Sequence, residues 1–363
     1  MIRAVLVDDE PPARVRMRQL LEAAGDVAIV GEAGSAIEAQ DVIRQTRPDL
    51  LFLDVEMPEL RGTALAASLP EPRPFIVFAT AFDSYALEAI AVDATDYLLK
   101  PVSRARLATT LDRVRTRLAK IAVEKDVVAA SAVQAHLWPG SLPPIPGFDC
   151  AAASLAARGV GGDFYDAFAI GDSTWAVLLG DASGKGVAAG LVASAVQARV
   201  NAAARHAHLD PEALMSVVDR DVYATTDGAR YATAVYGVLD ARSAQLTIVN
   251  AGHPPPLVMS TPGEVRTLTA TGPALGLLEA GAFGSHSLRL HAGTVLVAYT
   301  DGVSDAIDDA GDEFGEVRLI DAIEAVRHHG AAQICSSILD TIRGHRGGRQ
   351  DQDDVTVLVV KAS

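Results

Sequence analysis

The chain has 363 residues, more than one hydrophobic core normally supports, so we expect two domains joined by a connector. Its formal net charge of −15 argues against nucleic acid as the main partner and suits a protein that binds cations. Its cysteines, Cys150 and Cys335, are too far apart in the sequence for a metal-ligand pattern, which disfavours a disulfide framework and a zinc site.

The chain starts directly with a strand pattern and shows no charged-then-apolar leader. We find no apolar stretch that approaches the roughly 20 residues of a membrane span. The sequence therefore predicts a cytoplasmic protein that does not span a membrane.

In the first third of the chain, short apolar runs alternate with helical patterns. The predicted strands are Arg3–Val7, Val27–Gly31, Leu50–Leu53, Phe75–Phe78 and Tyr97–Leu99. The predicted helices cover residues 12–23, 36–45, 62–68, 84–91 and a segment that begins at Ser103. Five such units predict a doubly wound parallel (βα)5 sheet, whose functional side chains lie at the carboxyl ends of the strands.

Polar residues follow these predicted strands where such a site would form: Asp8, Asp9, Asp54, Thr80 and Lys100. Asp54 can attack a phosphoryl donor, while Asp8 and Asp9 can hold the Mg²⁺ that neutralises the phosphoryl oxygens. Thr80 and Lys100 can hydrogen-bond the resulting acyl phosphate. Each residue alone would be read as a cap or a solvated turn residue, but the five together favour phosphoryl transfer.

At these residues the segment 1–120 resembles the receiver domains of two-component response regulators. The resemblance implies a phosphoacceptor at Asp54 and a sensor histidine kinase or phosphotransfer protein as its partner. It also implies a Mg²⁺ site and a set of switch residues. The implied metal ligands are Asp8, Asp9 and Asp54, the switch residues are Thr80, Tyr97 and Lys100, and the Lys100–Pro101 peptide bond is expected to be cis.

The run Ala79–Ala86 looks most like receivers that are joined to LytTR-type DNA-binding domains. No basic DNA-binding segment follows in this chain. We therefore expect that a different output domain replaces the usual one.

A helical linker is predicted over residues 103–138, ending at Trp138-Pro139-Gly140. Within it, apolar or small side chains recur alternately four and three residues apart, with one charged interruption. These positions are Leu107, Leu111, Val114, Leu118, Ile121, Lys125, Val128, Ala132 and Ala135. The pattern fits a single surface helix packed on its own protein, but its length favours a homodimer through residues 107–135.

Beyond the stiff connector Pro143–Gly147, alternating strand patterns dominate. Ten strands are predicted between residues 149 and 360, with helices at 187–203, 211–225, 316–327 and 331–343. Because many strands come in hairpin order and the helices come in pairs, we expect stacked antiparallel β-sheets flanked by helices, in an αββα arrangement.

Four aspartates in this half stand at the ends of apolar runs, several of them beside glycines: Asp163, Asp181, Asp301 and Asp353. Clustered carboxylates repel each other unless a cation neutralises them, and oxygen-only ligands favour Mg²⁺ or Mn²⁺ over zinc. The sequence therefore predicts a two-metal hydrolase site in which no protein nucleophile is needed. His253 is either a general acid or, as we favour, a turn histidine that caps backbone groups.

Residues 139–363 resemble the SpoIIE/RsbU-type serine phosphatases, the bacterial branch of the metal-dependent protein phosphatases of type 2C. The matching motifs are Val160–Asp166, Gly180–Gly186, Asn250–Pro254, Gly272–Gly276, Tyr299–Gly302 and Asp353–Thr356. The resemblance implies that Asp181 and the Ala182 carbonyl bind metal, with Asp181 bridging two ions. It assigns Asp163 to one ion and Asp301 and Asp353 to the other. Asp354 is less certain, and Lys185 stands where many relatives have histidine.

The resemblance implies dephosphorylation of phosphoserine or phosphothreonine on a STAS-domain anti-sigma factor antagonist, in a partner-switching pathway. The choice between Mn²⁺ and Mg²⁺ stays open. Two rival functions are a binding module that only docks partners under receiver control and a DNA-binding regulator. The four aspartates count against the first rival and the acidic second half counts against the second.

Overall fold

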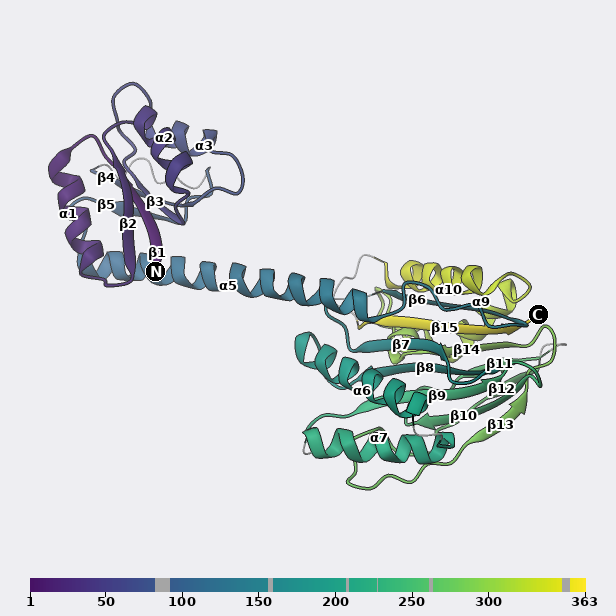
Figure 1. The fold of residues 1–363 in the computed structure, drawn as a ribbon. Helices are drawn as coiled ribbons and strands as arrows, with labels where there is room; N and C mark the ends of the chain where they lie inside the picture. The colour runs from purple at the N-terminus through teal and green to yellow at the C-terminus, as the bar shows by residue number, and fades with distance from the viewer. Residues whose placement is uncertain (82–91, 156–158, 207–208, 227, 261–263, 348–352) are drawn as a thin grey trace. The chain divides into compact units, whose positions relative to one another are not determined.

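A computed structural model describes residues 1–363 of the chain except 82–91, 156–158, 207–208, 227, 261–263 and 348–352. The chain forms two compact units, Met1–Glu124 and Lys125–Ser363. Helix α5 (Arg104–Leu137) begins in the first unit and ends in the second (Figure 1). Below, the first is called the receiver unit and the second the C-terminal unit.

The receiver unit is built on a five-stranded parallel sheet with the order β2-β1-β3-β4-β5. Its strands are β1 (Ile2–Val7), β2 (Val27–Ala33), β3 (Leu50–Leu53), β4 (Phe75–Thr80) and β5 (Asp96–Leu99). Its other described helices are α1 (Pro11–Glu22), α2 (Ala36–Thr46) and α3 (Gly62–Ser68). The helix predicted at residues 84–91 lies outside the described residues.

Two apolar clusters cover the two faces of this sheet. One contains side chains of α1 and of the first turns of α5, and the other contains side chains of α2 and α3. The central strands β1, β3 and β4 are buried on both faces, which explains why they read as continuous apolar runs in the sequence. The predicted doubly wound parallel sheet is confirmed.

The C-terminal unit contains two antiparallel sheets with the orders β13-β10-β9-β8-β7 and β12-β11-β14-β15-β6. The first sheet comprises β7 (Asp163–Ala169), β8 (Thr174–Ala182), β9 (Ala232–Asp240), β10 (Gln245–Ala251) and β13 (His286–Arg289). The second comprises β6 (Phe148–Leu155), β11 (Leu257–Met259), β12 (Val265–Thr267), β14 (Val295–Tyr299) and β15 (Val355–Ala362). The helices are α6 (Val187–His206), α7 (Pro211–Thr226), α8 (Asp301–Ser304), α9 (Gly315–Val326) and α10 (Ala331–Arg346).

Three apolar clusters hold these layers together. One lies between the two sheets, one between the first sheet and helices α6 and α7, and one between the second sheet and helices α9 and α10 (Figure 1). The predicted αββα layering is therefore confirmed. Helix α6 is long and apolar enough to cross a membrane by length and composition, yet its apolar residues Ala189, Ala193, Val196 and Val200 are buried in this core.

Helix α5 uses the predicted heptad positions in two different ways. Leu107, Leu111 and Val114 are buried in the receiver core, so they are not available for pairing with another chain. In contrast, Ile121 and Val128 are 40% and 69% exposed. The first three positions of the predicted seam therefore serve the receiver core, and a pairing surface could only begin after them.

Candidate active site

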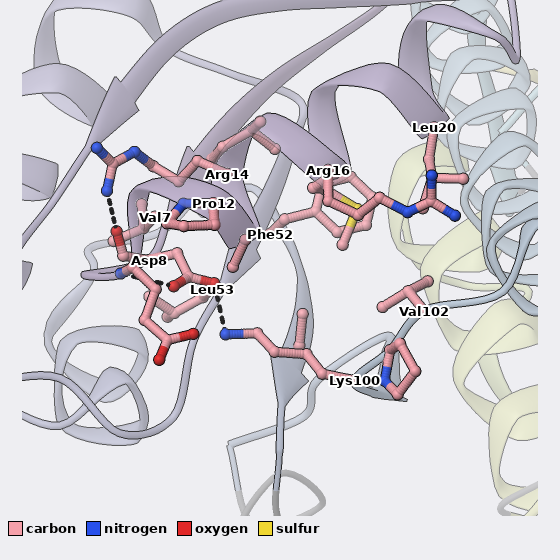
Figure 2. A pocket seen from close by; sticks show the side chains of 16 residues that line it. Val7, Asp8, Pro12, Arg14, Arg16, Leu20, Phe52, Leu53, Lys100 and Val102 are labelled. Atoms are coloured by element: carbon pink, nitrogen blue, oxygen red, sulfur yellow. Dashed lines mark hydrogen bonds and ion pairs between the residues drawn. The ribbon is translucent and has the colours of Figure 1, made fainter.

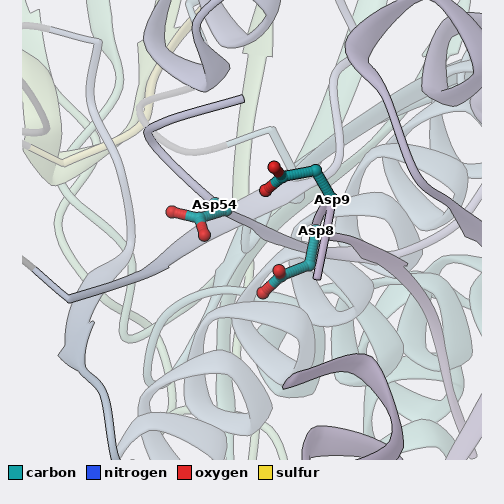
Figure 3. A group of neighbouring side chains, drawn as sticks. All are labelled: Asp8, Asp9 and Asp54. Carbon is teal, nitrogen blue, oxygen red and sulfur yellow. The ribbon is translucent and has the colours of Figure 1, made fainter. Parts of the chain in front are cut away.

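The residues predicted to form a phosphoacceptor site in the receiver unit lie close together. Ligand oxygens of Asp8, Asp9 and Asp54 lie within 4.8 Å of one another at the carboxyl ends of β1 and β3 (Figure 3). Lys100 Nζ lies 2.6 Å from Asp54 Oδ2 and 2.7 Å from Asp8 Oδ2. Burial raises the pKa of Asp54, and the Lys100 ammonium opposes this shift.

The predicted switch residues lie on neighbouring strands. Thr80 ends β4 and is buried, and Tyr97 lies half-buried in β5. The Lys100–Pro101 peptide bond is cis. All the receiver residues that we predicted from the sequence therefore lie on or directly after β1, β3, β4 and β5.

A pocket of about 270 Å³ opens next to this site (Figure 2). Asp8 and Lys100 line it together with apolar side chains of α1, β1 and β3, including Leu20 and Phe52. Arg14, also in α1, donates a hydrogen bond to the Asp8 carbonyl. The ion-paired cluster of Asp8, Asp54 and Lys100 thus borders an accessible apolar surface on the α1 side.

In the C-terminal unit, Asp163 and Asp181 face each other across the β7–β8 pair. Gly162, just before Asp163, leaves room for this arrangement, because a Cβ there would lie 2.8 Å from both Asp181 Oδ1 and the Ala182 carbonyl. The absence of a side chain at Gly162 therefore lets its backbone lie close to two predicted oxygen ligands.

Two threonines, one directly after β14 and one in β15, hold the Asp163 side chain. Thr300 and Thr356 both donate hydroxyl hydrogen bonds to Asp163 Oδ2, at 2.8 and 2.6 Å. The same Thr300 hydroxyl accepts a bond from the Thr356 N–H at 2.9 Å. Asp163 is almost fully buried, and these two bonds to its Oδ2 join the ends of the two sheets.

Asp354 and Asp301 reach the same end of the sheets. The Gly162 N–H donates a 3.0 Å hydrogen bond to Asp354 Oδ2. A Cβ on Gly302, next to Asp301, would lie 1.8 Å from the Asp354 carbonyl oxygen, so the segments of Asp301 and Asp354 touch through their backbones. Sequence patterns gave Asp354 less weight than Asp353, yet its carboxylate bonds directly to the glycine pair.

Asp353 takes a different position, since its side chain is 49% exposed and lies 3.0 Å from Lys185 Nζ. Among the described residues of the C-terminal unit, no three acidic side chains bring ligand atoms within 4.8 Å of one another. The three carboxylates expected to share one ion, Asp181, Asp301 and Asp353, therefore do not lie that close together as their side chains are placed.

Electrostatics indicate that these carboxylates form one cluster. Burial raises the pKa of Asp181, and the charges of Asp163, Asp301, Asp353 and Asp354 raise it further. Burial also raises the pKa of Asp163 and of Asp301. The positive charge of Lys185, whose side chain is 59% exposed, lowers the pKa of Asp301 and so opposes the effect of burial. An oxygen-only donor set with this excess of negative charge fits hard divalent cations.

His253 does not have the properties of a general acid at neutral pH. It is buried, and its ring nitrogen Nδ1 lies 2.8 Å from the Thr233 hydroxyl. Its backbone N–H donates a hydrogen bond to Asn250 Oδ1. Burial lowers its pKa to about 3, so the imidazole is neutral. The expectation that His253 caps backbone groups is not met, because its ring contacts a side chain and Asn250 instead bonds the backbone of this turn.

Residues that the sequence analysis did not single out also support the site. The Gln134 side chain, buried at the end of α5, donates to the Gly161 carbonyl at 2.8 Å and accepts from the Gly161 N–H at 3.0 Å. The Ser131 hydroxyl donates to the Gly159 carbonyl at 2.6 Å. Neither contact leaves a local sequence signal, because the partners are almost 30 residues apart.

A family model described as Stage II sporulation protein E (SpoIIE) matches residues 171–363, more than half of the chain. The chain belongs to the SpoIIE family. A second model, described as a response regulator receiver domain, matches residues 4–112. The chain thus joins a receiver domain to a phosphatase domain of the PP2C type. We refer to the C-terminal unit as the phosphatase unit from here on.

Curated relatives match parts of the chain. The transcriptional regulatory protein BtsR of Salmonella typhi is 49% identical over 121 residues, which are 33% of this chain and 51% of that protein. Protein IcfG of Synechocystis is 31% identical over 254 residues, covering 63% of this chain and 40% of its own length. The chain thus spans about half or less of these relatives. The LytTR receiver subtype stays a prediction.

Solved structures resemble the phosphatase unit. The SiaA-PP2C domain of Pseudomonas aeruginosa has a TM-score of 0.60 at 21% identity, covering 68% of this chain and 99% of that one. The RsbU and RsbW domains of Rv1364c from Mycobacterium tuberculosis have a TM-score of 0.55 at 28% identity, covering 62% and 63%. The first likeness, at this low identity, is one of fold.

Proposed function

We propose that this protein is a receiver-regulated, metal-dependent phosphatase that removes phosphate from phosphoserine or phosphothreonine on a protein. The observation that carries the proposal is a group of aspartates at one end of two facing sheets, in a chain of the SpoIIE family. The group comprises Asp163, Asp181, Asp301, Asp353 and Asp354. Membership of the family supports the reaction class, and the clustered carboxylates support the need for cations.

The proposed ligands for two Mn²⁺ or Mg²⁺ ions are Asp163, Asp181, the Ala182 carbonyl, Asp301 and Asp353. When bound, the cations would activate water and neutralise the substrate phosphate. The chain's own residues have supporting tasks. Thr300 and Thr356 hold Asp163 Oδ2 so that Oδ1 is oriented, and Gly162 keeps bulk away from Asp181 and Ala182.

A direct test compares hydrolysis of para-nitrophenyl phosphate by the full chain with Mn²⁺ and after chelation. Removing an outer contact to a metal ligand commonly costs 10–100-fold, so Asp181→Ala, which removes a shared ligand, should lose more than about 100-fold. Asp353→Ala should lose less, because it removes one exposed ligand of one ion. Near-normal turnover in Asp181→Ala would rule out the two-metal site, and chelation-resistant activity would rule out metal dependence.

The proposed substrate is a small phosphorylated STAS-domain anti-sigma antagonist, as part of partner switching. One structural relative contains both RsbU and RsbW domains, which supports a place for such phosphatases in these systems. An Asp301→Asn variant used as a trap, followed by analysis of captured proteins for phosphoserine, would identify the substrate. A captured set without phosphorylated STAS-domain proteins would contradict this part of the proposal.

For the receiver unit, the proposed phosphoacceptor is Asp54, with Mg²⁺ held by Asp8, Asp9 and Asp54 and with a sensor histidine kinase or phosphotransfer protein as donor. The proposed switch residues are Thr80, Tyr97 and Lys100, and the proposed location is the cytoplasm. A small phosphodonor with Mg²⁺ should label the wild type, and Asp54→Asn should stay unlabelled. Equal labelling of both would mean that another residue accepts the phosphoryl group.

A further inference from the structure

One side chain of helix α10 connects the two segments that carry Asp301 and Asp353. Arg346, the last residue of the helix, donates from Nη2 to the Gly302 carbonyl at 2.9 Å and to the Asp353 carbonyl at 3.1 Å. Gly302 directly follows Asp301. A single guanidinium nitrogen therefore bonds the carbonyl of Asp353 and the carbonyl of the residue that follows Asp301. We assign these two aspartates to the same metal ion.

The two segments are in close contact at this point. The space that a Cβ of Gly302 would occupy is taken by the Asp354 carbonyl oxygen, at 1.8 Å. A shift of either segment must therefore move the other, because their backbones are already in contact. Arg346 thus bonds to the point where the backbones that carry Asp301 and Asp353 meet.

Arginine is well suited to this position. Its guanidinium is planar and permanently charged, and its bonds to carbonyl oxygens are charge-assisted. Arg346 is half-buried, and this burial lowers its pKa, whereas the charges of Asp353 and Asp354 raise it. Its Nε is buried and has no hydrogen-bond partner among the described residues. Burial of the guanidinium therefore costs desolvation free energy, which the two backbone hydrogen bonds partly offset.

We propose that Arg346 is a positioning residue that sets cation affinity at the Asp301–Asp353 pair. It acts through the Gly302 and Asp353 carbonyls and does not contact the cation. The inference rests on the proposed function, since it assumes that these two aspartates bind a divalent ion.

The test measures Mn²⁺ binding by calorimetry on the full chain, in an Asp9→Asn background that weakens the receiver site. Arg346→Ala should bind Mn²⁺ about 10-fold more weakly, as expected for an outer contact to a metal ligand. Raising the Mn²⁺ concentration should restore most hydrolysis of para-nitrophenyl phosphate. Arg346→Lys should be intermediate, because a lysine keeps the charge but not the planar donor geometry.

Arg343→Ala is the matched control, since Arg343 lies in the same helix and pairs with Asp340 at the surface. It should leave Mn²⁺ affinity unchanged. Thermal unfolding in chelator distinguishes a role in Mn²⁺ affinity from a purely structural role. A purely structural role would lower the melting temperature of Arg346→Ala without changing its Mn²⁺ affinity. Unchanged affinity in Arg346→Ala, or in Arg346→Lys if the alanine variant does not fold, would overturn the inference. Absence of both binding and hydrolysis in the background protein would instead overturn the proposed function.

Discussion

Asp163 and Asp181 are opposite each other on paired strands, but their surroundings differ. The Thr300 and Thr356 hydroxyls stabilise the Asp163 carboxylate, whereas burial and like charge act against ionisation of both. The cluster therefore holds several carboxylates that are costly to ionise together. A protein with this arrangement should be less stable when the carboxylates are charged and no cation is bound.

This predicts a pH dependence of stability in chelator. A raised carboxyl pKa means that the folded state binds more protons than the unfolded state above the ordinary carboxyl range. Stability should therefore fall as pH rises from about 5 to about 8, through the raised pKa values of Asp163 and Asp181. Thermal unfolding in chelator should show this fall, and Mn²⁺ should reduce it. An equally steep fall in Asp181→Asn would contradict the assignment.

The sequence could single out the individual aspartates because each follows an apolar run and several adjoin glycine, which is a local signal. It could not predict how Asp163 is held, since Thr300 and Thr356 are 137 and 193 residues away. The choice between Asp353 and Asp354 also depends on packing. The contact of Asp354 with Gly162 spans 192 residues and leaves no trace in the local pattern.

At the scale of secondary structure elements, helix α5 shows the limit of periodicity. Leu107, Leu111 and Val114 fit a coiled-coil seam and a receiver core equally well, because both bury apolar side chains at spacings of three and four residues. The structure buries them in the receiver. Helix α8 was not predicted, since its four residues are too few for a periodic pattern.

The end of α5 leads to the next prediction. Gln134→Ala would leave the N–H and carbonyl of Gly161 unpaired in a buried position, costing roughly 1–3 kcal/mol for each group. Because Gly161 is two residues from Asp163, turnover should fall and Mn²⁺ affinity should weaken. Labelling of Asp54 should stay normal. His136→Ala, an exposed change in the same helical turn, is the control. Equal turnover in both variants would show that Gln134 does not support the site.

At the scale of the whole molecule, helix α5 runs from the receiver unit into the phosphatase unit. The first turns of α5 pack in the receiver core, and Gln134 near its end bonds the segment that leads to Asp163. Phosphorylation of Asp54 should draw Thr80 toward the phosphoryl group and turn Tyr97 inward, which changes the surface next to the start of α5. A bistable pairing of two such helices could transmit this change.

We expect phosphorylation to strengthen dimerisation through α5 and to raise phosphatase activity. Lys125 interrupts the seam, so the unphosphorylated pairing should be weak and sensitive to a few kcal/mol of bias. A constitutive dimer whose helices change register is the competing mechanism. The two differ in whether the oligomeric state changes with phosphorylation.

Sedimentation and turnover should be measured together, with and without the acyl-phosphate mimic beryllofluoride. Ile121→Glu/Val128→Glu places charge on two exposed seam positions and should abolish the mimic's effect on both readouts. Val123→Glu/Val133→Glu is the matched control, since these valines are 61% and 63% exposed on the same helix but lie outside the seam. In Asp54→Asn, beryllofluoride should change neither turnover nor sedimentation.

Coupling through α5 would be excluded if beryllofluoride left the turnover of the wild type unchanged. It would also be excluded if the seam variant responded as fully as the control. A raised turnover without a change in sedimentation would select the register mechanism.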